Sequence, residues 1–305
     1  MTINISSAPC CWGVDKISNP YLPPWQKVLQ QASLAGYKGI ELGPYGYLPL
    51  DIEVVSAELD KNGLSVVAGT IFDDLVTAGN LNNLIQQTHD ICSLLTRLPQ
   101  LPKQHRQHFA TYLVIIDHVH AQRSLLAGHP DAAPRLSAAK WQRMMDHIRA
   151  ISVVAGEYGV RPVIHPHAGG YIEFADEIMN VIEHIPYDIA GLCLDTGHLY
   201  YSKMDPIEWI RNHAERIDYL HFKDIDGSVY DNVMSRNVDF FDACAEGVMC
   251  SIGQGVIDYD GIYQLLQDIG YQGYITVEQE RDPRNSDTSL RDVKASLEYL
   301  QGRGF

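Results

Sequence analysis

The residues best able to do chemistry stand at the ends of apolar runs in the second half of the chain. The run VRPVIHPH ends on His165 and His167, which are two residues apart, and Glu173 follows a glycine-containing turn. The run GLCLD ends on Asp195, with His198 three residues later. Side chains two residues apart on an extended chain point the same way, so His165 and His167 would face one side of the sheet.

Two further runs end in the same manner. IDYLHFKD carries His221 and Lys223, again two residues apart, and YITVE ends on Glu278. One such residue is unremarkable, but several carboxylates buried together are costly unless a counter-charge is present, and a divalent cation supplies one. Mixed imidazole and carboxylate donors suit Mn²⁺, Co²⁺, Zn²⁺ or Mg²⁺ better than a metal selected by thiolates. The pattern therefore predicts one divalent metal ion where these runs converge.

The elements that must position these residues alternate between short apolar runs and longer helical patterns. Alternation of this kind predicts a parallel sheet covered by helices. The expected strands are Ile3–Pro9, Gly39–Leu42, Ser65–Ile71, Tyr112–Asp117, Pro162–His165, Ala190–Asp195, Tyr219–Lys223 and Tyr274–Glu278. Eight such units match a closed α/β barrel, a (β/α)8 TIM barrel, whose strands end at one mouth. A doubly wound open sheet is the alternative.

The chain is expected to form one domain over residues 1–305, because no linker interrupts the alternation. Two polar stretches, Pro99–Arg106 and Gly128–Leu136, flank the fourth strand, and residues 224–255 form an extended loop after the seventh. A long loop at the carboxyl end of a barrel strand is typical of a lid or specificity element.

Composition narrows the classes of partner. Lys and Arg number 23 against 38 Asp and Glu, a net charge of −15, which would repel nucleic acid. The sequence contains no run of about 18 apolar residues, so no membrane span is expected. The absence of a GxGxxG or P-loop pattern argues against a nucleotide cofactor. A small molecule is therefore the expected partner, and a homodimer and a tetramer both stay open.

The cysteines and the N-terminus bear on location. The six cysteines are scattered and form no CxxC pair, which is typical of reduced thiols in a cytoplasmic protein. The segment MTINISSAPCCWG shows no basic stretch followed by an apolar one, so no signal peptide is expected. Both observations predict a cytoplasmic location.

Several segments together resemble the xylose isomerase-like TIM barrel superfamily of sugar isomerases and epimerases. They are GYKGIELGPYGYLP, HPHAGGYIEF, LCLDTGHLYY, YLHFKDID, IGQGVIDY and GYITVEQERDP. The HPH pattern with its trailing glutamate is most similar to the inosose dehydratase-like proteins of myo-inositol catabolism. The resemblance covers most of the chain and implies one bound metal ion, with Mn²⁺ or Co²⁺ expected ahead of Zn²⁺ or Mg²⁺.

The resemblance also implies a ligand set. In this superfamily Glu, Asp, His and Glu from strands five to eight hold one metal, and Asp195, His221 and Glu278 match the last three. Here strand five ends on His165 instead of a glutamate. We expect Glu173 to fold back and supply the missing carboxylate. In the alternative, His165 is the ligand and Glu173 opens the following helix, where the helix dipole favours an acid.

The chemistry that this set would support is proton abstraction beside a carbonyl. The metal would stabilise an enediolate, His165 or His167 would act as acid and base, and Lys223 would bind an oxyanion. We expect a lyase that dehydrates a keto-polyol such as 2-keto-myo-inositol. A sugar isomerase or epimerase using the same chemistry is the alternative, and a non-catalytic sugar-binding protein is less favoured.

Three further residues are expected to contact the substrate. Trp12 follows the first strand, Glu41 ends the second, and His198 follows the sixth. The superfamily also contains DNA repair endonucleases, which hold three metals, but the early strands offer few ligands for these and the net charge is unfavourable.

Overall fold

The main sheet forms a ring of parallel strands. The computed structural model describes residues 3–99 and 111–305; the predicted stretch Pro99–Arg106 therefore lies almost wholly outside the described residues. The strands run in the order β3-β2-β1-β11-β8-β7-β6-β5-β4. Their bounds are β1 Asn4–Ser7, β2 Gly39–Ile40, β3 Ser65–Val66, β4 Ala68–Asp73, β5 Tyr112–Asp117, β6 Arg161–Ile164, β7 Gly191–Asp195, β8 Ile217–Phe222 and β11 Tyr274–Val277.

One residue joins the two ends of this sheet. Val67 separates β3 from β4; its N–H donates to the Ile40 carbonyl at 3.0 Å and its own carbonyl accepts from the Tyr112 N–H at 3.0 Å. The two short strands are thus halves of one run, which corresponds to the predicted third strand. The predicted barrel of parallel strands is confirmed, and the carboxyl ends of the strands share one mouth.

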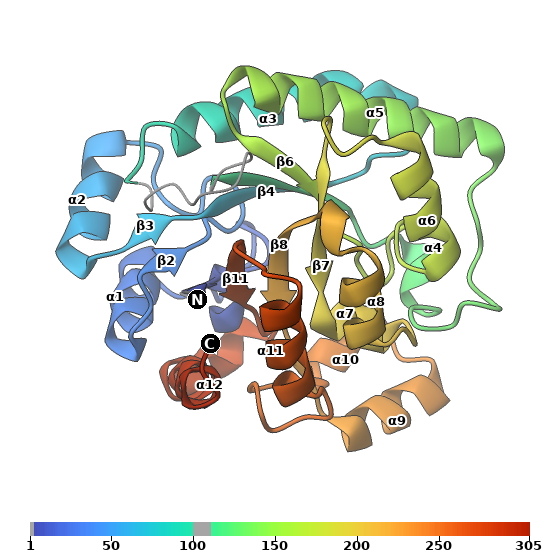
Figure 1. The fold of residues 1–305 in the computed structure, drawn as a ribbon. Coiled ribbons are helices and arrows are strands. Elements are labelled where there is room, and N and C mark those ends of the chain that lie inside the picture. Colours follow the sequence, from blue (N-terminus) through green and yellow to red (C-terminus); the bar gives the residue numbers. More distant parts are fainter. Residues whose placement is uncertain (1–2, 100–110) are drawn as a thin grey trace.

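Helices cover the outside of the ring (Figure 1). In Figure 1, α3 and α5 run along the top edge, and α11 and α12 lie near the C-terminus. The bounds are α1 Trp25–Ala35, α2 Ile52–Asn62, α3 Leu81–Leu95, α4 Ala121–Ser124, α5 Ala138–Glu157, α6 Ala175–His184, α7 Thr196–Tyr201, α8 Pro206–Asn212, α11 Tyr259–Asp268 and α12 Ser289–Gly302. Within residues 3–99 and 111–305, no helix has both the length and the apolarity to cross a bilayer.

Strand alternation divides the apolar residues into two cores. The larger core lies between the strands and the helices, and the smaller one fills the barrel interior. Inside the barrel, the Tyr112 and Tyr219 rings stack with centroids 4.5 Å apart. Every second residue of each strand points inward, so Cys193 and Tyr219 in the interior core place Asp195 and His221, two positions later, above them at the mouth.

The segment after β8 is more ordered than predicted. We expected residues 224–255 to form an irregular loop, but they contain α9 Gly227–Arg236, α10 Phe240–Ala245 and a two-stranded antiparallel ribbon of β9 Asp224–Ile225 and β10 Met249–Cys250. Both helices begin at aspartates whose side chains accept from backbone N–H groups, Asp226 for α9 and Asp239 for α10. Such caps stabilise helices too short to persist alone.

A glycine lets the chain turn sharply after β1. The 3-10 helix η1 Pro9–Trp12 ends at Gly13, which has φ 76°. A Cβ on Gly13 would overlap the backbone of Pro283, the first residue of η4 Pro283–Thr288. This close approach brings the segment after β1 against the segment after β11 at the barrel mouth.

Substitution of Gly13 should therefore cost more than conformational strain alone. We expect Gly13→Ala to lower the free energy of unfolding by more than about 2 kcal/mol, because it adds overlap to the left-handed strain. Gly63→Ala is the matched control, since Gly63 has φ 62° and the described part of the chain places no atom beyond its chain neighbours within 4 Å of the added Cβ. Its cost should stay near 1 kcal/mol. Urea unfolding followed by circular dichroism measures both, and equal losses would contradict the contact.

Candidate active site

Four strand-end side chains meet at the barrel mouth. His165, Asp195, His221 and Glu278 each offer a ligand atom, and these atoms lie within 4.8 Å of one another. The first three are at most 2 % exposed. Each follows an interior residue by two positions, as His221 follows Tyr219, so strand geometry alone directs them into one space. Asp195 and His221 are also direct partners in the β7–β8 register.

The two carboxylate oxygens of Asp195 have different roles: one caps a helix and the other faces the site. Oδ1 accepts from the His198 backbone N–H at 2.9 Å and so caps α7. Oδ2 faces the site, 3.6 Å from His165 Nε2 and 3.9 Å from His221 Nδ1. Burial opposes the charged carboxylate, but Lys223 and His198 outweigh it and hold the Asp195 pKa well below its usual value. Asp195 is therefore a fixed anion whose second oxygen faces the site.

His221 is oriented through Nε2 and faces the site with Nδ1. Nε2 lies 2.9 Å from Glu41 Oε1, and Nδ1 lies 3.0 Å from Glu278 Oε2. The Tyr219 hydroxyl also donates to Glu41 Oε1 at 2.6 Å. A carboxylate behind a histidine ring selects the tautomer and aims the other nitrogen. Glu41, predicted to contact substrate, thus borders the cavity but also supports His221.

Lys223 lies among three carboxylates. Its Nζ donates to Asp195 Oδ2 at 2.5 Å, to Glu278 Oε2, and is 3.2 Å from Glu280 Oε1. Burial disfavours the ammonium, but these carboxylates outweigh it and raise the Lys223 pKa well above its usual value. Gly197 makes room for this arrangement, since a Cβ there would lie 2.5 Å from Lys223 Cβ.

The donor set suits a divalent cation. His165 is 1 % exposed, and among residues 3–99 and 111–305 neither of its ring nitrogens has a hydrogen-bond partner; His221 Nδ1 has none there either. Buried polar atoms are normally satisfied. Asp195, Glu278 and Glu280 outnumber the single ammonium of Lys223 beside them. Unpaired imidazole nitrogens next to an excess of carboxylate charge fit a metal that takes nitrogen and oxygen ligands.

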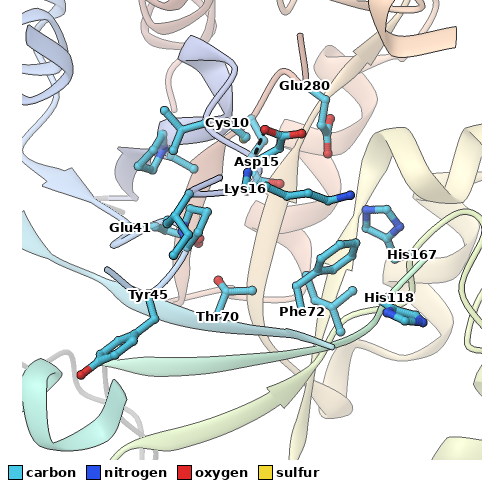
Figure 2. A pocket seen from close by; sticks show the side chains of 18 of the residues that line it. Cys10, Asp15, Lys16, Glu41, Tyr45, Thr70, Phe72, His118, His167 and Glu280 are labelled. Carbon is cyan, nitrogen blue, oxygen red and sulfur yellow. Dashed lines mark hydrogen bonds between the residues drawn. The ribbon is translucent and has the colours of Figure 1, made fainter. Parts of the chain in front are cut away.

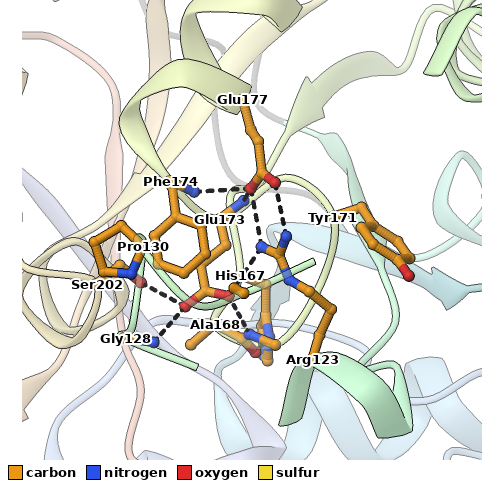
Figure 3. Close-up of polar contacts among 12 residues, drawn as sticks. Arg123, Gly128, Pro130, His167, Ala168, Tyr171, Glu173, Phe174, Glu177 and Ser202 are labelled. Carbon is orange, nitrogen blue, oxygen red and sulfur yellow. Dashed lines mark hydrogen bonds and ion pairs between the residues drawn. The ribbon is translucent and has the colours of Figure 1, made fainter. Parts of the chain in front are cut away.

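Glu173 lies in a different network (Figure 3). Its Oε1 accepts from the Gly128 N–H at 2.7 Å and the Ser202 hydroxyl at 3.1 Å. Its Oε2 accepts from the Gly169 N–H at 2.9 Å and from Arg123 Nη2 at 3.2 Å. Burial raises the Glu173 pKa to about 7. The structure therefore does not bring Glu173 to the other three predicted ligands, and His165 takes that place.

A cavity of about 450 Å³ opens beside the strand-end group (Figure 2). His165, His167, Lys223 and Glu278 line it. In Figure 2, His167 and Glu280 lie on one side and Glu41 and Tyr45 on the other. The cavity wall thus carries acid–base groups as well as the aromatic surface typical of small-molecule sites.

Two predicted substrate contacts lie behind this wall. Trp12 is fully buried in the outer core, and its Nε1 donates to Gln31 Oε1 at 2.7 Å. Trp12 is not among the residues that line the cavity, which differs from the predicted placement. His198 is 2 % exposed and belongs to a second group with His167 and Glu280. It therefore supports the cavity wall from within.

Comparison with known proteins identifies the family to which this chain belongs. Residues 29–302 match the family described as xylose isomerase-like TIM barrel. The chain belongs to the xylose isomerase-like TIM barrel family. It is 26% identical to the inosose dehydratase of Clostridium beijerinckii over 92% of this chain and 90% of that protein. It is 35% identical to the inosose dehydratase of Geobacillus kaustophilus over a shorter stretch, 49% of this chain and 48% of that protein.

Solved structures of this fold extend the comparison. The probable 3-DHS dehydratase AsbF from Bacillus anthracis superposes with a TM-score of 0.71 at 17% identity, covering 98% of this chain and 99% of that one. The IOLI protein, solved with a bound zinc atom, gives a TM-score of 0.71 at 15% identity and covers 99% of both chains. At identities of 15–17%, these superpositions show that this xylose isomerase-like chain shares the fold of the two proteins.

Sequence reasoning missed several residues that border the cavity. Glu280 lies two residues after Glu278, the same spacing that singled out other strand-end pairs, so this signal was present. Asp15 and Lys16 also line the cavity. They come from the turn after Gly13, and no periodic pattern in the sequence shows where that turn leads.

Removal of the Glu173 charge should damage the fold and leave the strand-end group intact. We expect Glu173→Gln to lower the free energy of unfolding by about 1–3 kcal/mol, because its amide leaves a buried donor around Glu173 without an acceptor, while Arg123 keeps its ion pair with Glu177. Bound Mn²⁺, measured by elemental analysis after gel filtration, should stay at the wild-type level. Asp176→Asn is the control, since Asp176 pairs with Arg135 at the surface and should cost less than about 1 kcal/mol. If Glu173→Gln lost Mn²⁺ but kept its stability, Glu173 would be a metal ligand and the account would be contradicted.

Proposed function

We propose that the chain is a divalent-metal-dependent lyase that dehydrates a keto-polyol of the 2-keto-myo-inositol type. The observation that carries this proposal is the group of His165, Asp195, His221 and Glu278 beside a cavity of about 450 Å³. A cavity of this size suits one small polyol. The relatives named inosose dehydratase over nine-tenths of the chain support the same substrate class.

The four side chains would hold one divalent cation. Two imidazoles and two carboxylates suit Mn²⁺, Co²⁺ or Zn²⁺, and we favour Mn²⁺ or Co²⁺. A cation bound there would polarise the substrate carbonyl and offset negative charge on its oxygen. Glu41 would hold the His221 ring so that Nδ1 faces the cation.

His167 is the proposed proton acceptor. Its Nδ1 lies 2.8 Å from the Ala168 carbonyl, which can only accept, so Nδ1 carries the hydrogen and Nε2 holds a lone pair in the neutral ring. Nε2 takes the proton from the carbon beside the carbonyl, and the C–H electron pair forms the enediolate double bond. The same proton then passes to the hydroxyl on the next carbon. The enediolate oxygen re-forms the carbonyl, the double-bond pair moves to the adjoining carbon–carbon bond, and the C–O bond breaks with its electrons, which gives the enol of the dione. Water leaves, and His167 regains its neutral form.

Lys223 supplies positive charge on the same side of the barrel. Its Nζ is held by Asp195 and Glu280, and the side chain lines the cavity. A fixed ammonium stabilises negative charge that develops on a substrate oxygen, and it needs no reorganisation during the reaction. Lys223 is therefore the proposed contact for a substrate oxyanion.

A direct assay separates dehydration from isomerisation. Purified protein with Mn²⁺ should convert 2-keto-myo-inositol to a dione, seen as a rising enol absorbance, and should leave ketohexoses unchanged by chromatography. Conversion of a ketohexose to its epimer or isomer, with no dione from 2-keto-myo-inositol, would instead establish an isomerase or epimerase. Binding of these sugars without turnover would indicate a sugar-binding protein.

A cytoplasmic location belongs to the same proposal. All six cysteines are free thiols, and free thiols persist in reducing compartments.

Asp195→Asn tests the metal site without removing a helix cap, because asparagine caps helices as well as aspartate does. We expect bound Mn²⁺ and turnover to fall together by at least about 100-fold, since the substitution removes a ligand charge. Asp205→Asn is the matched control: Asp205 caps α8 in the same way but lies away from the cavity, and it should behave as wild type. Full turnover by a metal-free Asp195→Asn protein would refute the assignment.

A further inference from the structure

A second group of titratable side chains reaches the cavity from β5 and is independent of the metal site. Strand β5 ends on Asp117, and His118 and His120 follow. His118 is two residues after Ile116, and both line the cavity. The His118 backbone N–H donates to the Asp73 carbonyl at 3.0 Å, which extends the β4–β5 ladder by one residue. Figure 2 shows His118 on the side of the cavity that carries His167.

Asp117 anchors this group from behind the wall. Its carboxylate is 2 % exposed, and Oδ1 accepts from the Leu75 N–H at 3.2 Å. Oδ2 accepts from the Tyr171 N–H at 2.8 Å and lies 2.9 Å from His120 Nε2. Because a carboxylate only accepts, His120 Nε2 must carry the hydrogen.

The tautomer of one histidine then determines the other. In neutral His120 the second nitrogen, Nδ1, is an acceptor. It lies 3.3 Å from His118 Nε2, so His118 donates from Nε2 and leaves Nδ1 with a lone pair. The His120 backbone N–H donates to the Gly169 carbonyl at 3.0 Å, which ties this arrangement to the loop that follows His167. Burial lowers the His118 pKa, and the nearby His120 adds to that effect.

A cation site is the other arrangement that these residues could form. Asp74, Asp117 and His120 offer atoms within 4.8 Å of one another. Asp74 Oδ1, however, already accepts from the Val76 and Thr77 N–H groups at 2.7 and 2.9 Å. Both oxygens of Asp117 are also engaged. The hydrogen bonds therefore account for this group without a metal.

We propose that Asp117 and His120 orient His118 as a specificity-determining residue whose Nδ1 accepts a hydrogen bond from a hydroxyl of the substrate. Asp117 and His120 are positioning residues, and only His118 contacts the ligand. A wall that presents a fixed acceptor selects polyols with a hydroxyl at that position and rejects analogues that lack it. This inference rests on the proposed function, because it assigns one contact to the same polyol.

The tautomer can be read on the free protein. Long-range ¹H–¹⁵N correlation spectra of ¹⁵N-histidine-labelled protein, with His118→Gln used to assign the signals, should show His118 protonated at Nε2 and bare at Nδ1. Asp117→Asn should mix the two tautomers, because an amide can donate as well as accept. Wild-type protein with Nδ1 of His118 protonated at pH 7.5 would overturn the proposal, whatever the substrate proves to be.

Two substitutions of His118 test the contact itself. Asn places its amide near the Nδ1 position and Gln places its amide near the Nε2 position. We expect His118→Gln to raise KM for 2-keto-myo-inositol about tenfold, the effect of one lost hydrogen bond, with kcat changed less than about threefold. His118→Asn should stay within about threefold of wild-type KM. His89→Gln, on the outer helix α3, is the control. An unchanged KM in His118→Gln would overturn the contact.

Failure of the proposed function is distinguishable from failure of this inference. Wild-type protein that does not turn over 2-keto-myo-inositol would refute the dehydratase and leave the tautomer result standing. The contact is then measured as calorimetric binding of myo-inositol to wild type, His118→Gln and His118→Asn. Loss of affinity in His118→Gln alone supports the contact, and equal affinities or no binding overturn it.

Discussion

The concentration of buried carboxylate charge at the barrel mouth is the constraint on which the site depends. Glu41, Asp195, Glu278 and Glu280 lie around His221 and Lys223, and most of these groups are nearly inaccessible to water. Isolated buried anions would cost several kcal/mol each. The ammonium of Lys223 offsets part of this charge. A divalent cation held by the unpaired nitrogens would complete the balance.

The strands and the loops that follow them place these charged side chains at the mouth. Strands β6, β7 and β8 each deliver a side chain to the mouth two positions beyond a residue of the interior core. Asp195 also shows how one side chain serves two purposes, since one oxygen caps α7 and the other faces the site. Asp117 and Glu173 hold the loop that follows β6, which contains His167. Their carboxylates accept from the backbone N–H groups of that loop.

The parts that sequence could predict are those that depend on strand period alone. Asp195, His221 and Glu278 were expected to converge, and the same two-residue rule brings His165 beside them after the interior residue Val163. The preference for Glu173 rested on family resemblance. Its partner Arg123 lies 50 positions earlier, on a short helix whose path no periodicity shows. Trp12 and the helices within 224–255 escaped prediction for a similar reason, because tight turns and short capped helices leave little pattern in the sequence.

The most direct test of the account is the number of histidine nitrogens bound to the metal. Pulsed EPR of the protein with one equivalent of Mn²⁺, in natural-abundance and ¹⁵N-histidine-labelled forms, reports nitrogen nuclei coordinated to the ion. The account predicts couplings from two inequivalent imidazole nitrogens, one lost in His165→Gln and the other in His221→Gln. A single coupled nitrogen, unaffected by His165→Gln, would contradict the four-residue site.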